Sequence, residues 1–400
     1  MIRRIQIDNF KSLDGFSLLP APQSLSRFTC LIGSNGSGKT SVLQVLDFLG
    51  YFMRGKLRDW SEDRGWEDVL LSSSFDSSPL GLFKASVTVE LDSSVIVNWS
   101  VHYNEMSSHE SVVDETVSAN GQILLGAANG NVEFQDREGS SRRLDGLSFA
   151  GSSLSVLQDG TLPSSLGLLK DLFSRKITSF ELVSPESLKR DSQTSTSIGR
   201  RGENLAGFTA NLTREIQDRI TEIMRQFYPN LQNVYRDQDL ISKLFRQNAA
   251  EKFLREAVPA SQFSDGFTRI LALVAQIESS NTPDRLLLID EIEDGIHPEL
   301  MSRLVKYLVE SKVQVIATTH SPLILNFLTD EQAKESSIFL YRNSEGRTRA
   351  CRYFDLPSTS KKLGMLGPGE VYVDTSIEQL ALEAEEMERG AATGAGATNQ

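Results

Sequence analysis

The feature that most constrains this chain is a glycine-rich segment of eight residues near its N-terminus. Residues 33–40 read Gly-Ser-Asn-Gly-Ser-Gly-Lys-Thr and match the phosphate-binding pattern G-x-x-x-x-G-K-[ST]. An apolar stretch at Phe28–Ile32 predicts a strand before the segment, and an amphipathic pattern at Ser41–Phe52 predicts a helix after it. The pattern therefore predicts a phosphate site on a strand–loop–helix unit of an α/β fold.

The residue types in this loop suit a bound triphosphate. Glycines allow successive backbone N–H groups to turn inward around phosphate oxygens, and the helix that follows presents its positive end to the same anion. Lys39 is expected to reach the β- and γ-phosphates and to act in catalysis, and the Thr40 hydroxyl is expected to bind Mg²⁺. We therefore expect ATP and Mg²⁺ as cofactors. The predicted ATP-binding residues are Gly33, Ser34, Asn35, Gly36, Ser37, Gly38, Lys39, Thr40 and Ser41.

A second pattern pairs an apolar run with two acids. Leu286–Ile289 predicts a buried strand, and Asp290 and Glu291 follow it directly. Without a phosphate loop upstream, a solvated strand end would be the better interpretation. With it, Asp290 is expected to bind magnesium and Glu291 to act as the general base on the attacking water. A glutamate directly after the aspartate favours hydrolysis over transfer to an organic acceptor.

Composition sets the class of protein. The 400 residues include 41 Lys plus Arg and 53 Asp plus Glu, so the formal net charge is −12, and 39% of the residues are hydrophobic. These values fit a globular protein and exclude wholesale disorder. No apolar run is long enough for a membrane span, and the N-terminus lacks the apolar core of a signal peptide. The two cysteines, Cys30 and Cys351, favour a reducing cytoplasm. The acidic balance argues against general coating of nucleic acid but is compatible with a local basic groove.

Three further motifs surround the acidic strand end in a fixed order. Phe263–Arg269 precedes it, Glu293–Pro298 follows it, and Thr318–Pro322 comes after the next predicted strand at Val313–Ala317. This order of signature, acidic strand, D-loop and switch histidine resembles the ABC-type ATPase heads of the SMC and RecF group. More narrowly, the chain resembles short AAA-type ATPases related to the OLD family, many of which belong to prokaryotic defence systems. The opening residues 5–13 and the loop 199–206 also fit that subgroup, and the resemblance covers residues 1–355.

The resemblance implies a mechanism. Two heads would dimerise with ATP between the phosphate loop of one copy and the signature of the other. Ser264, Asp265 and Gly266 would then contact the nucleotide in trans. His320 would sense the γ-phosphate as a catalytic residue, and Asp294 would lie in the segment that crosses the dimer interface. The signature departs from the transporter form because it reads Ser-Asp-Gly, and no glutamine can be placed as the Q-loop ligand.

The implied fold is an α/β P-loop NTPase head of the ABC type. Its mixed, largely parallel sheet would be flanked by helices, with an N-terminal antiparallel β subdomain and an inserted α+β region. The hairpin of Leu82–Leu91 and Val95–Tyr103 would belong to that subdomain. Four segments are expected. They are residues 1–103 and 237–372 for the two parts of the head, 104–236 for an insertion of irregular structure and short strands with a helix at 205–227, and 373–400 for a tail with a disordered end.

Several functions remain open from the sequence. The leading hypothesis is an ATP-hydrolysing homodimer, or higher oligomer, whose nucleotide state controls a separate effector such as a nuclease or toxin, in antiviral defence. No acidic nuclease-like cluster follows residue 330, so the effector is expected on another polypeptide. The alternative is a RecF-like DNA-binding ATPase of DNA repair, for which a nucleic-acid partner is needed. A transporter ATPase is disfavoured by the signature, and a non-hydrolysing scaffold is disfavoured by the intact Lys39, Asp290 and Glu291. No membrane partner is expected.

Some residues also have plain structural interpretations. His297 with Pro298 would cap the following helix or touch a neighbouring subunit. The basic pairs Arg142-Arg143 and Arg200-Arg201 would be solvated surface or would contact nucleic acid or a partner. Trp60 and Trp66 are expected to pack a lid on the head rather than stack on bases.

Overall fold

The computed structural model describes the chain in two compact units. It covers residues 1–400 except 20–21, 66–81, 92–94, 105–111, 280–284 and 397–400. The first unit comprises Met1–Thr178, Asp284–Asp290 and Gln314–Gln400, and the second comprises Ser179–Pro283 and Glu291–Val313. The composition of the chain led us to expect an insertion at 104–236, whereas residues 104–178 lie in the first unit.

A six-stranded, mostly parallel sheet forms the centre of the first unit. Strands β14, β15, β3 and β16 are parallel neighbours in that order, and β17 pairs antiparallel with β16 at one edge. Every residue of β3, β14 and β15 is buried, which explains their uninterrupted apolar sequences. The strands are β10 (Ile177–Ser179), β14 (Leu286–Ile289), β15 (Gln314–Thr318), β3 (Phe28–Ile32), β16 (Ser337–Arg342) and β17 (Thr348–Arg352).

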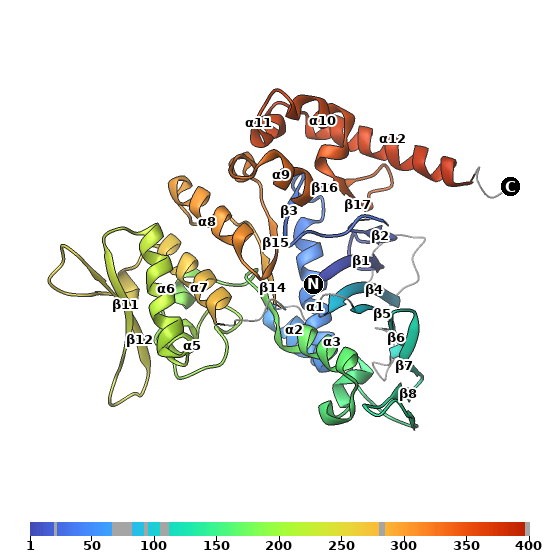
Figure 1. Cartoon of the computed structure of the whole chain (residues 1–400), viewed down its shortest axis with the longest axis horizontal. Coiled ribbons are helices and arrows are strands. Elements are labelled where there is room, and N and C mark those ends of the chain that lie inside the picture. Colours follow the sequence, from blue (N-terminus) through green and yellow to red (C-terminus); the bar gives the residue numbers. More distant parts are fainter. Residues whose placement is uncertain (20–21, 66–81, 92–94, 105–111, 280–284, 397–400) are drawn as a thin grey trace. The chain divides into compact units, whose positions relative to one another are not determined.

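Helix α1 (Lys39–Arg54) covers β14 and β15 of this sheet and packs against α3 (Ser164–Arg175) (Figure 1). Its buried stripe includes Val42, Leu46 and Leu49, as the periodicity of the sequence predicts. The predicted strand–loop–helix unit is therefore confirmed. The short helix α2 (Leu57–Asp63) follows, and its Trp60 is buried and donates to Asp47 at 3.0 Å, as a packing role requires. Trp66 lies outside the described residues.

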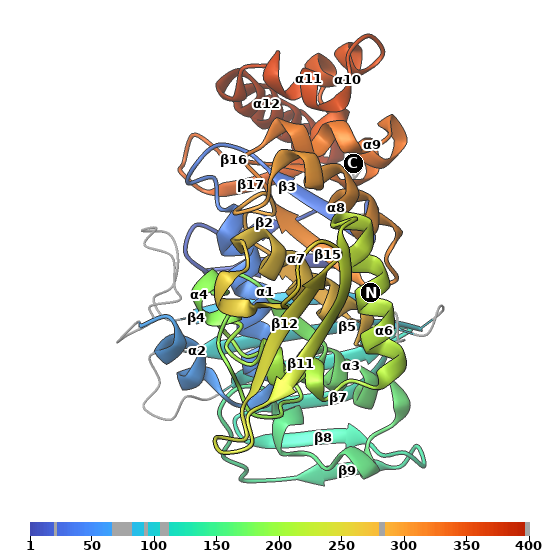
Figure 2. The ribbon, with the colours of Figure 1, turned by 90° about the vertical axis from the view of Figure 1, so that its left-hand side faces the viewer.

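An eight-stranded antiparallel sheet makes up the rest of the first unit's core. The predicted hairpin of β4 and β5 is confirmed, with Val87 paired to Trp99 near its centre. The sheet continues through β6 to β9 (Figures 1 and 2), in a region where the sequence predicts irregular structure with short strands. The order is β2 (Phe16–Ser17), β1 (Ile2–Asp8), β4 (Leu82–Leu91), β5 (Val95–Asn104), β6 (Val112–Ala119), β7 (Gln122–Ala128), β8 (Asn131–Gln135) and β9 (Ser141–Leu144).

Two Asn-Gly turns explain these additional strands. Asn120-Gly121 joins β6 to β7 and Asn129-Gly130 joins β7 to β8, and all four residues have positive φ. Two-residue loops of this kind match the twist of paired antiparallel strands. The carboxylate of Glu115 on β6 is fully buried there and accepts from the Trp99 indole at 2.8 Å and from both Ser152 and Ser153.

The second unit combines a three-stranded sheet with helices. β11 and β12 pair antiparallel along their length, and α6 packs on β11 and on α7 (Figure 2). The elements are α4 (Pro185–Leu188), α5 (Leu205–Ala210), α6 (Arg214–Phe227), β11 (Leu231–Gln238), β12 (Phe245–Glu251), β13 (Val258–Pro259), η3 (Ala260–Gln262), α7 (Asp265–Glu278) and α8 (Pro298–Glu310).

The helix expected at 205–227 is interrupted, so that prediction is wrong in its middle. α5 ends at Ala210 and α6 begins at Arg214, with the Thr213 hydroxyl accepting from the N–H of Ile216. The side-chain amide of Gln217 donates to the carbonyls of Thr209, Ala210 and Leu212. These bonds satisfy carbonyl groups that a helix end leaves without intrahelical partners, and they stabilise the break.

The C-terminal part of the first unit is helical. Helix α12 (Ile377–Gly396) extends into the end of the tail that we expected to be disordered. Its Leu380 and Ala384 are buried, and its Glu383 accepts from both the N–H and the hydroxyl of Ser358. Among the described residues, no helix has the length and apolar composition of a membrane span. The remaining elements are η1 (Ser153–Val156), η2 (Asp159–Thr161), η4 (Pro322–Phe327), α9 (Asp330–Ser336), η5 (Tyr353–Asp355), α10 (Pro357–Leu363) and α11 (Pro368–Val373).

Candidate nucleotide site

The phosphate loop joins β3 to α1 in a conformation that requires its glycines. Gly33, Gly36 and Gly38 have φ values of 147°, 74° and 105°, a region that is costly for residues with a Cβ. Gly38 is the N-cap of α1. The loop therefore opens at the positive end of a 16-residue helix that has no acidic side chain in its first turn.

Lys39 lies folded over this loop. Its side chain is buried, and its ammonium donates to the carbonyl oxygens of Gly33 and Ser34, each at 2.9 Å. The Ser37 hydroxyl is also fully buried and has no hydrogen-bond partner within the described part of the chain. A cation and a hydroxyl in a loop that leads into a helix N-terminus fit the oxygens of a triphosphate.

The loop and the acidic strand end meet across the sheet. The Thr40 hydroxyl lies 3.2 Å from each carboxylate oxygen of Asp290, although 250 residues separate them in the sequence. The Thr318 hydroxyl, from the end of β15, donates to the same carboxylate at 2.6 Å. Because β14 and β15 are parallel neighbours, their C-terminal ends bring these side chains together.

These oxygens suit a magnesium ion. A hydroxyl and a carboxylate are hard ligands, and Mg²⁺ commonly takes few protein ligands because phosphates and water complete its octahedron. No cluster of three or more His, Cys, Asp or Glu side chains that could hold a metal is found in the described ranges. Thr40 and Asp290 therefore fit a metal that is bound together with a nucleotide rather than by the protein alone.

His320 lies two residues beyond β15, at the same edge of the sheet as the phosphate loop. The N–H of Thr319 donates to the carbonyl of Leu31 on β3 at 3.2 Å, which fixes this edge. The imidazole of His320 is exposed. Its role as a γ-phosphate sensor stays a prediction.

The signature residues belong to the second unit and begin α7. The Ser264 hydroxyl caps this helix by accepting from the N–H of Phe267 at 3.2 Å, and Asp265 pairs with Lys189 at 2.7 Å. A Cβ on Gly266 would lie 2.8 Å from the carbonyl oxygen of Gly295, so this glycine permits close packing on the D-loop. Ser264 and Asp265 are exposed on the second unit.

A side chain that the sequence did not single out braces the residue predicted as the base. Arg269 donates to the carbonyl of Glu291 at 2.9 Å and to the carboxylate of Asp294 at 3.1 Å. Glu291 has a φ of 46°, which costs a non-glycine residue roughly 1 kcal/mol or more. Arg269 therefore helps to hold a strained turn between the acidic strand end and the D-loop.

The remaining candidates have structural partners. The imidazole of His297 accepts from the N–H of Glu299 at 3.3 Å, so it caps α8 as one of its two interpretations predicts. Arg142 pairs with Asp136 at 2.7 Å, and this bond is the main cause that holds the pKa of Asp136 below its usual range. Arg143 pairs with Asp145 at 2.8 Å.

Comparison with solved structures identifies the class of fold. The SMC head bound to the C-winged helix domain of ScpA superposes with a TM-score of 0.53 at 15% identity, covering 88% of this chain and 96% of that one. The Pyrococcus furiosus Smc head with an extended coiled coil, bound to the C-terminal domain of ScpA, gives 0.51 at 14% identity, covering 88% and 95%. The fold is therefore that of an SMC-type P-loop ATPase head.

Comparison with sequence families gives matches for two segments of the chain. Residues 1–78 match the family described as "AAA ATPase domain", and residues 171–326 match "AAA domain, putative AbiEii toxin, Type IV TA system". Structural maintenance of chromosomes protein 4 of Caenorhabditis elegans is 30% identical over 146 residues, which are 36% of this chain and only 9% of that protein. Two segments of this chain therefore match AAA ATPase domain families, and its fold is that of the SMC heads.

Proposed function

We propose that this chain binds MgATP at the phosphate loop and hydrolyses it. The observation that supports this most directly is the approach of the Thr40 hydroxyl to both oxygens of Asp290, at 3.2 Å. A hydroxyl after the loop lysine and a carboxylate after an apolar strand are the protein ligands that a nucleotide-bound Mg²⁺ needs. When bound, the metal would neutralise charge on the phosphates.

Three further side chains have proposed roles in the reaction. The Lys39 ammonium would leave the loop carbonyl oxygens and bind the β- and γ-phosphates, because its positive charge interacts more strongly with their negative charge. Glu291 would accept a proton from the attacking water as the water oxygen bonds to the γ-phosphorus and the bond from that phosphorus to the bridging oxygen of ADP breaks. His320 would donate a hydrogen bond to the γ-phosphate from the edge of the sheet.

We further propose that ATP closes a homodimer. Ser264 is exposed at the N-terminus of α7, where a hydroxyl and backbone N–H groups can meet an anion from another copy. Asp265 and Gly266 would take part in the same contact. A γ-phosphate bound by two copies gives the closed state contacts that the open state lacks, and hydrolysis removes them.

The closed dimer would control a separately encoded effector in antiviral defence. Support comes from the matched family whose description refers to a type IV toxin–antitoxin system. The two SMC heads above were each solved with part of ScpA bound, which is a precedent for a partner protein on this fold.

Replacement of Glu291 by Gln tests the enzyme and the dimer together. It removes the base but leaves Thr40, Asp290 and Lys39 in place, so we expect ATP binding within about twofold of the parent and turnover reduced at least about 100-fold. Light scattering with ATP and Mg²⁺ should show a stable dimer. The matched control is Glu299→Gln, an exposed glutamate in the same unit, which should hydrolyse ATP like the parent.

The outcomes separate the proposals. Parental turnover in Glu291→Gln would contradict the role of the base, and a monomer in saturating ATP would contradict the dimer. Lys39→Ala should weaken ATP binding, and unchanged affinity in a calorimetric titration would contradict the phosphate site. DNA binding that strengthens with ATP and falls steeply with salt would point instead to the DNA-repair ATPase.

A further inference from the structure

The hairpin of β16 and β17 lies directly against the phosphate loop. Its Arg342 donates to the carbonyl of Gly36 at 2.8 Å, and its Thr348 hydroxyl donates to the carbonyl of Ser37 at 2.9 Å. A Cβ on Gly38 would lie 2.5 Å from the Thr348 hydroxyl oxygen. Gly38 is therefore required by its close approach to the hairpin as well as by its positive φ.

These bonds fix the directions of peptide groups in the loop. In a planar trans peptide the C=O and the following N–H point in opposite directions. Thr348 holds the Ser37 carbonyl toward the hairpin, so it directs the N–H of Gly38 away from the hairpin. Arg342 donates to the carbonyl of the preceding peptide group, which joins Gly36 to Ser37. The N–H of the same peptide group, on Ser37, donates to the carbonyl of Ser34 at 3.2 Å and closes a turn.

Thr348 is well placed for this role because it is completely buried. Its hydroxyl also lies 2.8 Å from that of Ser12, and its N–H donates to the Ser12 carbonyl at 2.9 Å. The Thr348 hydroxyl is thus within donating distance of the Ser37 carbonyl oxygen and of the Ser12 hydroxyl oxygen. Its orientation is therefore fixed from both sides.

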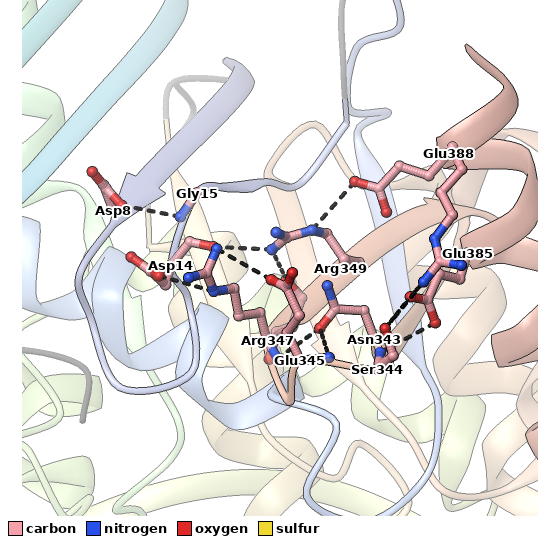
Figure 3. Close-up of polar contacts among 12 residues, drawn as sticks. Asp8, Asp14, Gly15, Asn343, Ser344, Glu345, Arg347, Arg349, Glu385 and Glu388 are labelled. Carbon is pink, nitrogen blue, oxygen red and sulfur yellow. Dashed lines mark hydrogen bonds and ion pairs between the residues drawn. The ribbon is translucent and has the colours of Figure 1, made fainter. Parts of the chain in front are cut away.

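The hairpin itself is held by an ionic network (Figure 3). Arg347 pairs with Asp14 at 3.2 Å, and Arg349 donates to the Asp14 carbonyl at 2.9 Å and pairs with Glu388 of α12 at 3.2 Å. At the hairpin turn, the hydroxyl of Ser344 donates to Glu385 of α12 at 2.5 Å. The β16–β17 hairpin, which contacts the phosphate loop, is therefore also held by Asp14 and by α12.

We infer that the β16–β17 hairpin is a positioning element of the nucleotide site, in which Thr348 and Arg342 set the loop's peptide groups before phosphate binds. Neither residue would touch the nucleotide. The inference rests on the proposed ATP site, and it adds that the hairpin contacts raise the affinity of this site for MgATP. It concerns ground-state binding, so the variants should raise KM for MgATP and leave kcat nearly unchanged.

Replacement of Thr348 by Val keeps the side-chain shape and removes the hydroxyl. We expect MgATP and MgADP to bind about five- to tenfold more weakly by calorimetric titration, because one hydrogen bond that orients the loop is lost. Thr348→Ser retains the hydroxyl and should restore binding to within about twofold. The matched control is Thr359→Val, which removes another buried hydroxyl bonded to backbone carbonyls in the same unit. It should lower Tm to a similar extent and bind ATP like the parent.

Arg342→Met is a second variant at an exposed position, so folding should be retained. We expect roughly threefold weaker MgATP binding, compared with no change for Arg352→Met, whose guanidinium donates to the Ser24 carbonyl at 2.8 Å. Parental affinity in Arg342→Met, or in a folded Thr348→Val, would overturn the inference. If the parent itself bound no MgATP, the proposed function would fail instead.

Discussion

The carboxylate of Asp290 accepts hydrogen bonds from threonines of two separate segments. Thr40 is a proposed magnesium ligand, whereas Thr318 bonds to the carboxylate from the end of β15 and is buried. When Mg²⁺ binds, Thr40 would turn to the metal, and Thr318 would keep the carboxylate oriented. Groups that orient a metal ligand in this way commonly affect metal affinity 10- to 100-fold.

Replacement of Thr318 by Val should therefore raise the Mg²⁺ concentration for half-maximal ATPase activity by about tenfold. Thr318→Ser keeps the hydroxyl and should behave like the parent. The measurement is a magnesium titration of turnover at saturating ATP. Equal magnesium requirements in the valine variant and the parent would contradict this role.

At the residue scale, the sequence predicted what lies inside contiguous motifs. Lys39 and Thr40 share a motif, and Asp290 follows an apolar strand, so local pattern was sufficient to propose them as candidates. Arg269 and Thr348 act through carbonyl groups 22 and 311 residues away in the sequence. A carbonyl acceptor exists at every residue, so no pattern in one sequence marks these partners.

Among the elements, the break between α5 and α6 shows that a continuous hydrophobic stripe does not require a continuous helix. Leu205, Phe208, Ile220 and Phe227 are buried, but they belong to two helices instead of the one expected at 205–227. Thr213 is a residue type that commonly caps a helix, but the spacing of apolar residues across 205–227 favoured one continuous helix over a break there. In contrast, the two Asn-Gly pairs between β6 and β8 are typical of hairpin turns and could have predicted these strands. The polar composition of the region favoured irregular structure instead.

The cap gives a test of this break. Thr213→Ala should lower the free energy of unfolding by about 1 kcal/mol, because the N–H of Ile216 loses its acceptor. Thr213→Ser retains the acceptor and is the matched control. Chemical denaturation measures both variants, and an alanine variant as stable as the parent would indicate that the hydroxyl does not stabilise α6.

On the scale of the whole molecule, the order of motifs predicted the fold, which the superposition with SMC heads confirms. The division into units was harder to predict because the chain passes between them four times, and Asp290 and Glu291 fall on opposite sides of one passage. Because this boundary between the units lies inside a sequence motif, no change in amino-acid composition marks it.

Assembly of the proposed dimer is tested at the signature. Ser264→Arg places a long cation at an exposed helix N-terminus, so we expect it to block closure and to lower turnover about tenfold or more, while ATP still binds each copy. Binding is followed by calorimetry and closure by light scattering. Thr329→Arg, at the N-cap of α9, is the control. A signature variant with parental turnover would show that the contact in trans is unnecessary.

The position of β3 in its sheet has a consequence for biosynthesis. Both neighbours of this strand, β15 and β16, come from beyond residue 313, so the phosphate loop leaves the ribosome long before either neighbour exists. Until then β3 has two unpaired apolar edges, which are prone to wrong pairing. The pairing of β3 cannot be complete until translation has passed β16 (Ser337–Arg342), so the nucleotide site can mature only after that point.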